Sequence, residues 1–125
     1  MSPMSRVLTG PHLTFDLNEQ VEDLRKDPNY ERTGRVGRTL VKSGALRLTL
    51  VVLAQGIDAG THRAETPMTV QVVGGRLRFR VEEQHFEIGA GEVLFFGPDH
   101  AQDITALEDT ALLLTITGED AAEVD

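Results

Sequence analysis

The sequence predicts an all-β domain, an antiparallel sandwich or barrel, preceded by one short helix. From residue 38 onward, apolar or alternating runs of strand length follow one another and are rich in Val, Leu, Ile, Thr and Phe. Short turn-forming segments, most of which contain glycine, separate these runs at nearly regular spacing. Such a series of short strands, with almost no helix between them, is typical of antiparallel sandwiches and barrels. The expected strands span 39–42, 47–54, 69–73, 77–81, 85–88, 93–96, 103–106 and 111–117.

The segment 76–81 has the clearest strand pattern, because arginine and apolar residues alternate strictly along it. Successive side chains of a strand point to opposite faces of the sheet, so one face is expected in the core and the other in water. We therefore interpret Arg76, Arg78 and Arg80 as a solvated face rather than as a site for an acidic ligand.

Three parts are expected along the chain. Residues 1–37 form an N-terminal arm, a short helix and a loop; residues 38–117 form the barrel; residues 118–125 form an acidic tail. The helix is placed within 13–27, because Val21 and Leu24 are three residues apart and Asp16 or Asn18 can cap its start. Pro28 is expected to end this helix, and the polar segment 27–37 is expected to be a loop.

The composition excludes several classes of partner and chemistry. The chain has 125 residues, enough for one compact domain, with 20 acidic and 12 basic side chains and a net charge of −8. Such an acidic chain repels phosphate, so no nucleic-acid partner is expected. No window approaches the ~20 apolar residues of a membrane span, so no membrane partner is expected. Cysteine is absent, which excludes disulfides and thiolate chemistry and agrees with a cytoplasmic location.

One spacing of glycine and histidine stands out in the barrel region. Gly56 precedes His62 by six residues, and Gly75 follows His62 by thirteen, in the stretch GIDAGTHRAETPMTVQVVGG. This stretch resembles the first motif of the cupin superfamily, G(X)5HXH(X)3,4E(X)6G. The resemblance extends over about 39–117 and implies a small single-domain cupin: a double-stranded β-helix, or jelly-roll barrel, of the RmlC-like type, with a short N-terminal helix or arm.

Both cupin motifs are degenerate in this sequence. The second histidine of the first motif falls on Ala64 and its glutamate on Met68. The second motif, G(X)5PXG(X)2H(X)3N, matches only at Gly91, and its histidine position holds Gln102. In metal-binding cupins three histidines and one glutamate hold a divalent metal, and of these four positions only His62 is kept. Alanine and methionine do not ligate such ions and glutamine is a weak ligand, so no cofactor is expected.

A remodelled metal site is the alternative. His62, His100 and one acid, Glu65 or Glu92, would supply three ligands for a divalent transition metal. The chain would then be a metal-dependent cupin enzyme of the dioxygenase or isomerase type. Otherwise His100 is a solvent-facing turn residue in the sequence Gly-Pro-Asp-His.

Without a metal, the barrel is expected to bind a small molecule. His62 and Gln102 would be its polar anchors and Met68 part of a largely apolar wall, with His100 nearby. The same composition also suits a packed core, which makes a non-catalytic structural module a further alternative. His62 would then be a structural histidine that bonds to the backbone. A sugar epimerase, as found among some other cupins, would need a catalytic tyrosine. It is disfavoured here, because Tyr30, the only tyrosine, lies outside the expected strands.

The resemblance also implies a homodimer, since small cupins often pair through sheet edges and an N-terminal strand. An antiparallel sandwich has exposed edges that must be covered. The apolar arm over residues 8–15 is expected to cover one of them, either its own or that of a partner.

Overall fold

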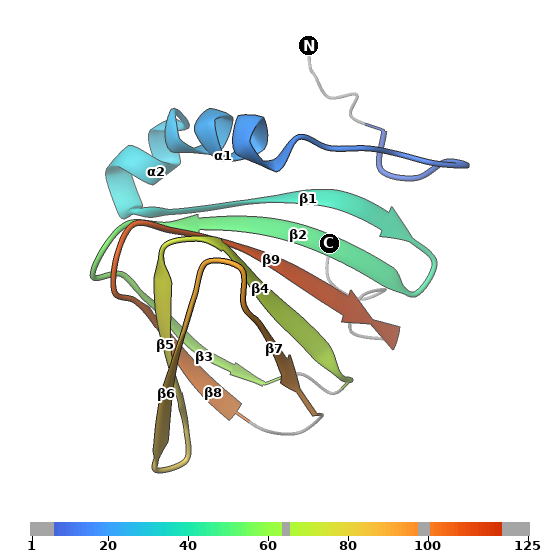
Figure 1. The fold of residues 1–125 in the computed structure, drawn as a ribbon. Coiled ribbons are helices and arrows are strands. Elements are labelled where there is room, and N and C mark those ends of the chain that lie inside the picture. The colour runs from blue at the N-terminus through green and yellow to red at the C-terminus, as the bar shows by residue number, and fades with distance from the viewer. Residues whose placement is uncertain (1–6, 64–65, 98–100, 119–125) are drawn as a thin grey trace.

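A computed structural model describes residues 7–63, 66–97 and 101–118, the side chains of 61–63 and 101 excepted. Nine strands and two helices make up this part of the chain (Figure 1). The all-β prediction is confirmed. The strands are β1 (Arg35–Ser43), β2 (Leu46–Leu53), β3 (Asp58–Arg63), β4 (Met68–Gly74), β5 (Arg76–Val81), β6 (Gln84–Gly89), β7 (Val93–Phe96), β8 (Ala101–Ala106) and β9 (Thr110–Thr117).

The strands form two antiparallel sheets that face each other. One sheet has five strands in the order β1-β2-β9-β4-β7, and the other has four in the order β3-β8-β5-β6. Strands far apart in the sequence, such as β2 and β9 or β3 and β8, are neighbours in space. This arrangement is the jelly-roll barrel that the sequence predicts, with the N-terminal helices outside it.

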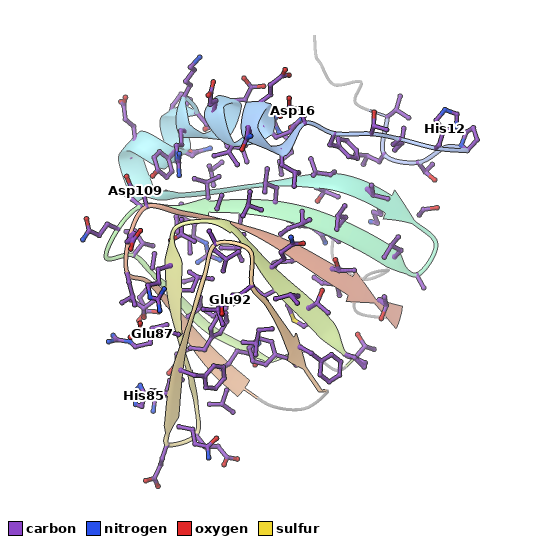
Figure 2. All side chains as sticks on the ribbon, viewed as in Figure 1. His12, Asp16, His85, Glu87, Glu92 and Asp109 are labelled. Atoms are coloured by element: carbon purple, nitrogen blue, oxygen red, sulfur yellow. The ribbon has the colours of Figure 1, made fainter. Side chains whose placement is uncertain are left out.

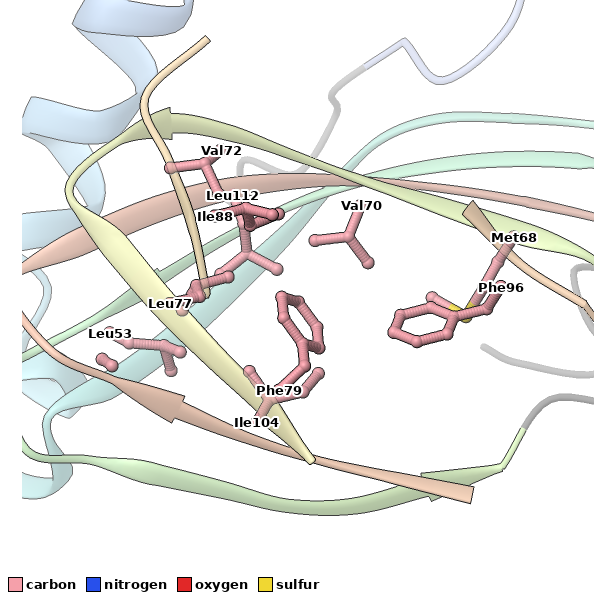
Figure 3. Packing of buried hydrophobic residues seen from close by; sticks show 11 residues of the cluster. Leu53, Met68, Val70, Val72, Leu77, Phe79, Ile88, Phe96, Ile104 and Leu112 are labelled. Carbon is pink, nitrogen blue, oxygen red and sulfur yellow. The ribbon is translucent and has the colours of Figure 1, made fainter. Parts of the chain in front are cut away.

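The core lies between the two sheets (Figure 3). On β5, Leu77 and Phe79 are buried while the three arginines are exposed, so the alternation predicted for 76–81 is confirmed. The Phe79 ring stacks on Phe86 at 6.0 Å and lies tilted against Phe96 at 5.4 Å. The buried residues of this cluster are Leu53, Met68, Val70, Val72, Leu77, Phe79, Ile88, Phe96, Ile104, Ala106 and Leu112.

The helix α1 (Leu17–Arg25) covers the outer face of the five-stranded sheet near β1 and β2. Asp16 caps it, because its carboxylate accepts a hydrogen bond from the Glu19 N–H at 3.2 Å. Val21 and Leu24 are buried in a second apolar cluster that also contains Leu50 and Val52 of β2. The predicted helix is confirmed, with shorter bounds. Within the described chain, no helix has the length and apolar character needed to span a membrane.

The prediction that residues 27–37 form a loop is wrong. This segment contains a second helix, α2 (Pro28–Thr33), and the first residues of β1, which begins at Arg35. Pro28 starts this helix as well as ending the previous one, since the first helical position needs no backbone N–H. Asp27 caps α2, and Gly34 ends it with a left-handed φ of +76°.

The strand β3 was also missed. Its sequence, DAGTHR, has no apolar alternation, and it lies between the expected strands 47–54 and 69–73. Pairing decides its conformation: Gly60 and Thr61 lie opposite Ile104 and Asp103 of β8. Strand propensity depends largely on such neighbours, so a short polar edge strand is hard to predict from sequence.

The N-terminal arm lies along its own sheet. The Leu8 carbonyl accepts a hydrogen bond from the Lys42 N–H at 2.9 Å, and the Thr9 hydroxyl donates to Ser43 Oγ at 2.8 Å. Both contacts fall on β1, the edge strand of the five-stranded sheet. Of the two edges considered, its own or that of a partner, the arm covers its own.

Candidate functional site

The pairing of β3 with β8 brings two of the predicted site residues into register. His62 and Gln102 are direct partners across the two antiparallel strands. The side chain of His62 lies outside the part of the chain that the structure describes, and so do all atoms of His100. The structure therefore characterises the predicted site through Gln102 and Met68.

Gln102 is a buried amide without a partner. Its side chain is 1% exposed, and it alternates along β8 with Ile104 and Ala106, which are buried in the core. Neither Oε1 nor Nε2 of Gln102 forms a hydrogen bond to any described residue. A buried polar group left unpaired costs about 1–3 kcal/mol of stability. The Gln102 amide thus has both its NH2 group and its carbonyl oxygen unused among the described residues.

Met68 lies on the inner face of β4. It is 8% exposed and belongs to the core cluster between the sheets. Figure 3 shows its side chain beside Phe96, its register partner on β7. The position that carries a glutamate in metal-binding cupins therefore presents a thioether in an apolar setting.

A cavity of about 90 Å³ lies between the two sheets. This volume is about three times the volume that one molecule occupies in liquid water, and it is smaller than the ~150 Å³ cavity that holds benzene. Gln102 is the next inward-facing residue along β8 from Ile104, which lines the cavity. The lining residues are Arg35, Val51, Leu53, Ala59, Met68, Ile104, Leu112 and Leu114.

Arg35 is the one charged residue in this lining, and sequence reasoning missed it. It begins β1 in register with Leu53, which also faces the cavity. Its Nη1 donates a hydrogen bond to the Ala59 carbonyl of β3 at 3.1 Å, so the side chain crosses from one sheet to the other. A strand predicted from residue 35 would have placed Arg35 on the inner face; the loop assigned to 27–37 hid it.

The described residues do not fit a conventional cupin metal site. A thioether at Met68 and a neutral amide at Gln102 replace two strong ligands, and Ala64 has no donor atom. Within the ranges that the structure covers, no group of three or more His, Cys, Asp or Glu side chains lies close enough together to hold a metal ion.

The alternative metal set is only partly described. Glu65 and His100 lie outside the described residues. Glu92 is engaged locally, because its Oε1 accepts a hydrogen bond from the Gly89 N–H at 2.7 Å. Figure 2 shows His12 at the far end of the N-terminal arm and His85 on the β5–β6 hairpin, well apart from each other.

The outer face of the four-stranded sheet carries a polar groove of about 260 Å³. Acidic and basic residues share its lining, and Arg80 forms an ion pair with Asp103 across β5 and β8. Arg76 pairs with Glu87 on the same face at 3.1 Å. These pairs support the interpretation of the arginines as a solvated surface. The lining residues are Asp58, Arg78, Arg80, His85, Asp103 and Thr105.

Comparisons with known proteins identify the fold. No protein-family model and no curated protein matches the sequence. A cupin-2 domain containing protein from Shewanella frigidimarina has a similar structure, with a TM-score of 0.68 at 14% identity over 83% of this chain and 94% of that chain. A conserved protein of unknown function from Streptococcus pyogenes gives a TM-score of 0.70 at 19% identity, over 93% and 96% of the two chains. The chain has the fold of the small RmlC-like cupins.

A larger enzyme contains the same fold. Salicylate 1,2-dioxygenase from Pseudoaminobacter salicylatoxidans gives a TM-score of 0.75 at 12% identity over 94% of this chain. The match spans 36% of the dioxygenase chain. At these identities the likeness shows the fold and leaves the chemistry to the residues of the site.

Proposed function

We propose that this chain binds a small molecule inside the barrel without a conventional site of three histidines and one glutamate. The unpartnered amide of Gln102 is the observation that carries this proposal. Nearly all buried polar atoms of folded proteins have a hydrogen-bond partner, so an amide with both groups unused calls for an explanation. A bound molecule that pairs with the amide supplies one.

The surroundings of Gln102 support a ligand rather than a purely structural role. The cavity next to it is walled by apolar side chains, which bind the body of a small organic molecule while a few polar groups orient it. A structural module would gain stability from a leucine at position 102, because such a residue buries no unpaired polar atom. Among proteins with this fold, salicylate 1,2-dioxygenase has been solved as adducts with gentisate, so the fold is compatible with a small organic ligand.

The test is a binding screen on the intact chain and two variants. Ligand-observed NMR with a library of small carboxylates, amides and alcohols identifies binders, and titration gives each Kd. Gln102→Leu removes the amide; Gln71→Leu makes the same change at an exposed position of β4 and serves as the control.

We expect the wild type and Gln71→Leu to bind the same compounds with equal affinity, and Gln102→Leu to bind them about fivefold or more weakly, as for the loss of a hydrogen bond. Equal binding by all three proteins, or no binder at all, would contradict the proposed function.

A further inference from the structure

We propose that Arg35 is a second, anionic-ligand anchor at a lateral entrance to the barrel, and that the ligand is a short aliphatic carboxylate with a hydroxyl or carbonyl group at its far end. Arg35 would bind the carboxylate, the cavity would hold the carbon chain, and Gln102 would pair with the far polar group. This inference rests on the proposed small-molecule function and specifies its ligand class.

The position of Arg35 defines the entrance. It lies on β1, an edge of the five-stranded sheet, and its hydrogen-bond partner Ala59 lies on β3, an edge of the four-stranded sheet. Both residues line the cavity, together with Val51 and Leu53 of the strand next to β1. The guanidinium therefore stands where the two sheets leave the barrel open at its side.

No carboxylate in the described part of the chain forms an ion pair with Arg35. Arg38, Arg76 and Arg80 each have a carboxylate partner. Among the described residues, Arg35 has only the Ala59 carbonyl, which uses one of the five N–H donors of a guanidinium. An arginine whose donors are largely unused, at the edge of an apolar cavity, favours a carboxylate, because the two planar groups form paired charge-assisted hydrogen bonds.

The cavity limits the size and shape of the ligand. With a volume of about 90 Å³ it is smaller than the ~150 Å³ cavity that holds benzene, and it suits a few methylene groups. Every lining residue except Arg35 is apolar, so the middle of the ligand is expected to be a hydrocarbon chain.

The separation of the two anchors sets the chain length. Ala59, which Arg35 contacts, lies three residues along β3 from His62, the register partner of Gln102. Three residues of a strand span about 10 Å. Each anchor is joined to the ligand by a hydrogen bond of about 3 Å, which leaves about 4 Å between the two polar ends of the ligand. A chain of about two or three carbons bridges this interval. An amide offers both a donor and an acceptor, which suits a hydroxyl or a carbonyl at the far end.

Matched ligands and variants test each anchor separately. The probes are 3-hydroxypropanoate, propanoate and 1,3-propanediol, titrated by NMR or calorimetry into the wild type, Arg35→Gln and Gln102→Leu. Arg78→Gln, at an exposed position of β5, controls for the loss of one positive charge. Thermal melting of every variant checks that it is folded. Arg35→Lys tests whether a positive charge without the planar guanidinium group is sufficient to bind the carboxylate.

We expect 3-hydroxypropanoate to bind most tightly to the wild type. Arg35→Gln should weaken the binding of both carboxylates about tenfold or more and leave that of 1,3-propanediol unchanged, as for the loss of charge-assisted hydrogen bonds. Gln102→Leu should weaken the binding of 3-hydroxypropanoate and the diol but not that of propanoate, and Arg78→Gln should change nothing.

Two outcomes distinguish a failure of the proposed role of Arg35 from a failure of the proposed small-molecule binding. If Arg35→Gln binds carboxylates as the wild type does while Gln102→Leu still weakens hydroxylated ligands, the role of Arg35 is overturned and the proposed function stands. If neither variant changes the affinity for any probe, both are overturned.

Discussion

Gly75 and Thr110 lie in closer contact than any larger residue would permit. A Cβ atom built on Gly75 would come within 2.5 Å of Thr110 Oγ1, and Gly75 has a left-handed φ of +94°. Thr110 is fully buried, and its hydroxyl accepts a hydrogen bond from the Arg76 N–H at 3.1 Å. The last glycine of the first motif is thus explained by the tight passage from β4 to β5 against the start of β9.

Gly75→Ala is expected to destabilise the fold by at least about 2 kcal/mol, because the steric clash adds to the cost of a left-handed backbone. Gly74→Ala is the matched control, since nothing lies within 4 Å of a Cβ there and its φ is not positive. Urea unfolding of both variants gives the comparison. Similar stability losses at the two positions would contradict the assignment.

The β5–β6 hairpin offers a stabilising change. Val81 pairs with Gln84, so Glu82 and Glu83 form a two-residue loop, and Glu82 has a positive φ of 56°. Glu82→Gly is expected to raise the free energy of unfolding by about 0.5–1 kcal/mol, because glycine adopts this conformation without steric cost. Glu83→Gly should lower it by a similar amount. The opposite order in thermal or urea unfolding would refute the turn assignment.

Gln102→Leu should separate stability from binding. Removing an unpaired buried amide is expected to raise the free energy of unfolding by about 1–2 kcal/mol, while affinity for hydroxylated ligands falls. Gln71→Leu, at an exposed position, should stay within about 0.5 kcal/mol of the wild type. A loss of stability in Gln102→Leu would mean that the amide is already paired, for example with ordered water.

Metal analysis tests the remodelled-site alternative. Protein purified without chelators is expected to contain far less than one transition metal per chain, because Met68 and Gln102 replace two strong ligands. Treatment with a chelator followed by dialysis should leave the melting temperature unchanged. A stoichiometric metal that disappears in His62→Ala would instead establish the metal-dependent enzyme.

The homodimer implied by the family resemblance stays a prediction. The N-terminal arm covers the β1 edge, whereas the edge strand β7 exposes Val93 and Phe95, the latter 65% exposed. We expect light scattering coupled to size exclusion to give twice the chain mass, and Phe95→Glu to shift the protein toward monomer. A wild type that elutes with the mass of one chain would contradict the prediction.

The sequence predicts the barrel where its patterns are local. The alternation over 76–81 places β5. The double-stranded β-helix is what the resemblance to the cupin motif, carried by Gly56, His62 and Gly75, implies. The same motif alignment predicts that Met68 and Gln102 line a ligand site; both side chains are buried, and their role in binding stays a prediction.

The rest depends on contacts that no short window contains. The polar strand β3 exists because β8 pairs with it, and α2 follows α1 so closely that Pro28 was interpreted as a stop only. Arg35 could not be recognised until β1 was known to begin there. Its relation to Ala59 then requires the two sheets to be placed against each other.

The strand β2 is enclosed on both sides, which has a practical consequence for making the protein. Its outer side chains Leu50 and Val52 are covered by α1, while Val51 and Leu53 line the cavity. A truncated protein that starts at residue 38 would lack α1, which would expose that outer surface to solvent, and it would lack Arg35 as well. Recombinant versions used for biophysical work should therefore retain the helical segment together with its cap, from Asp16 onward, even where only the barrel is wanted.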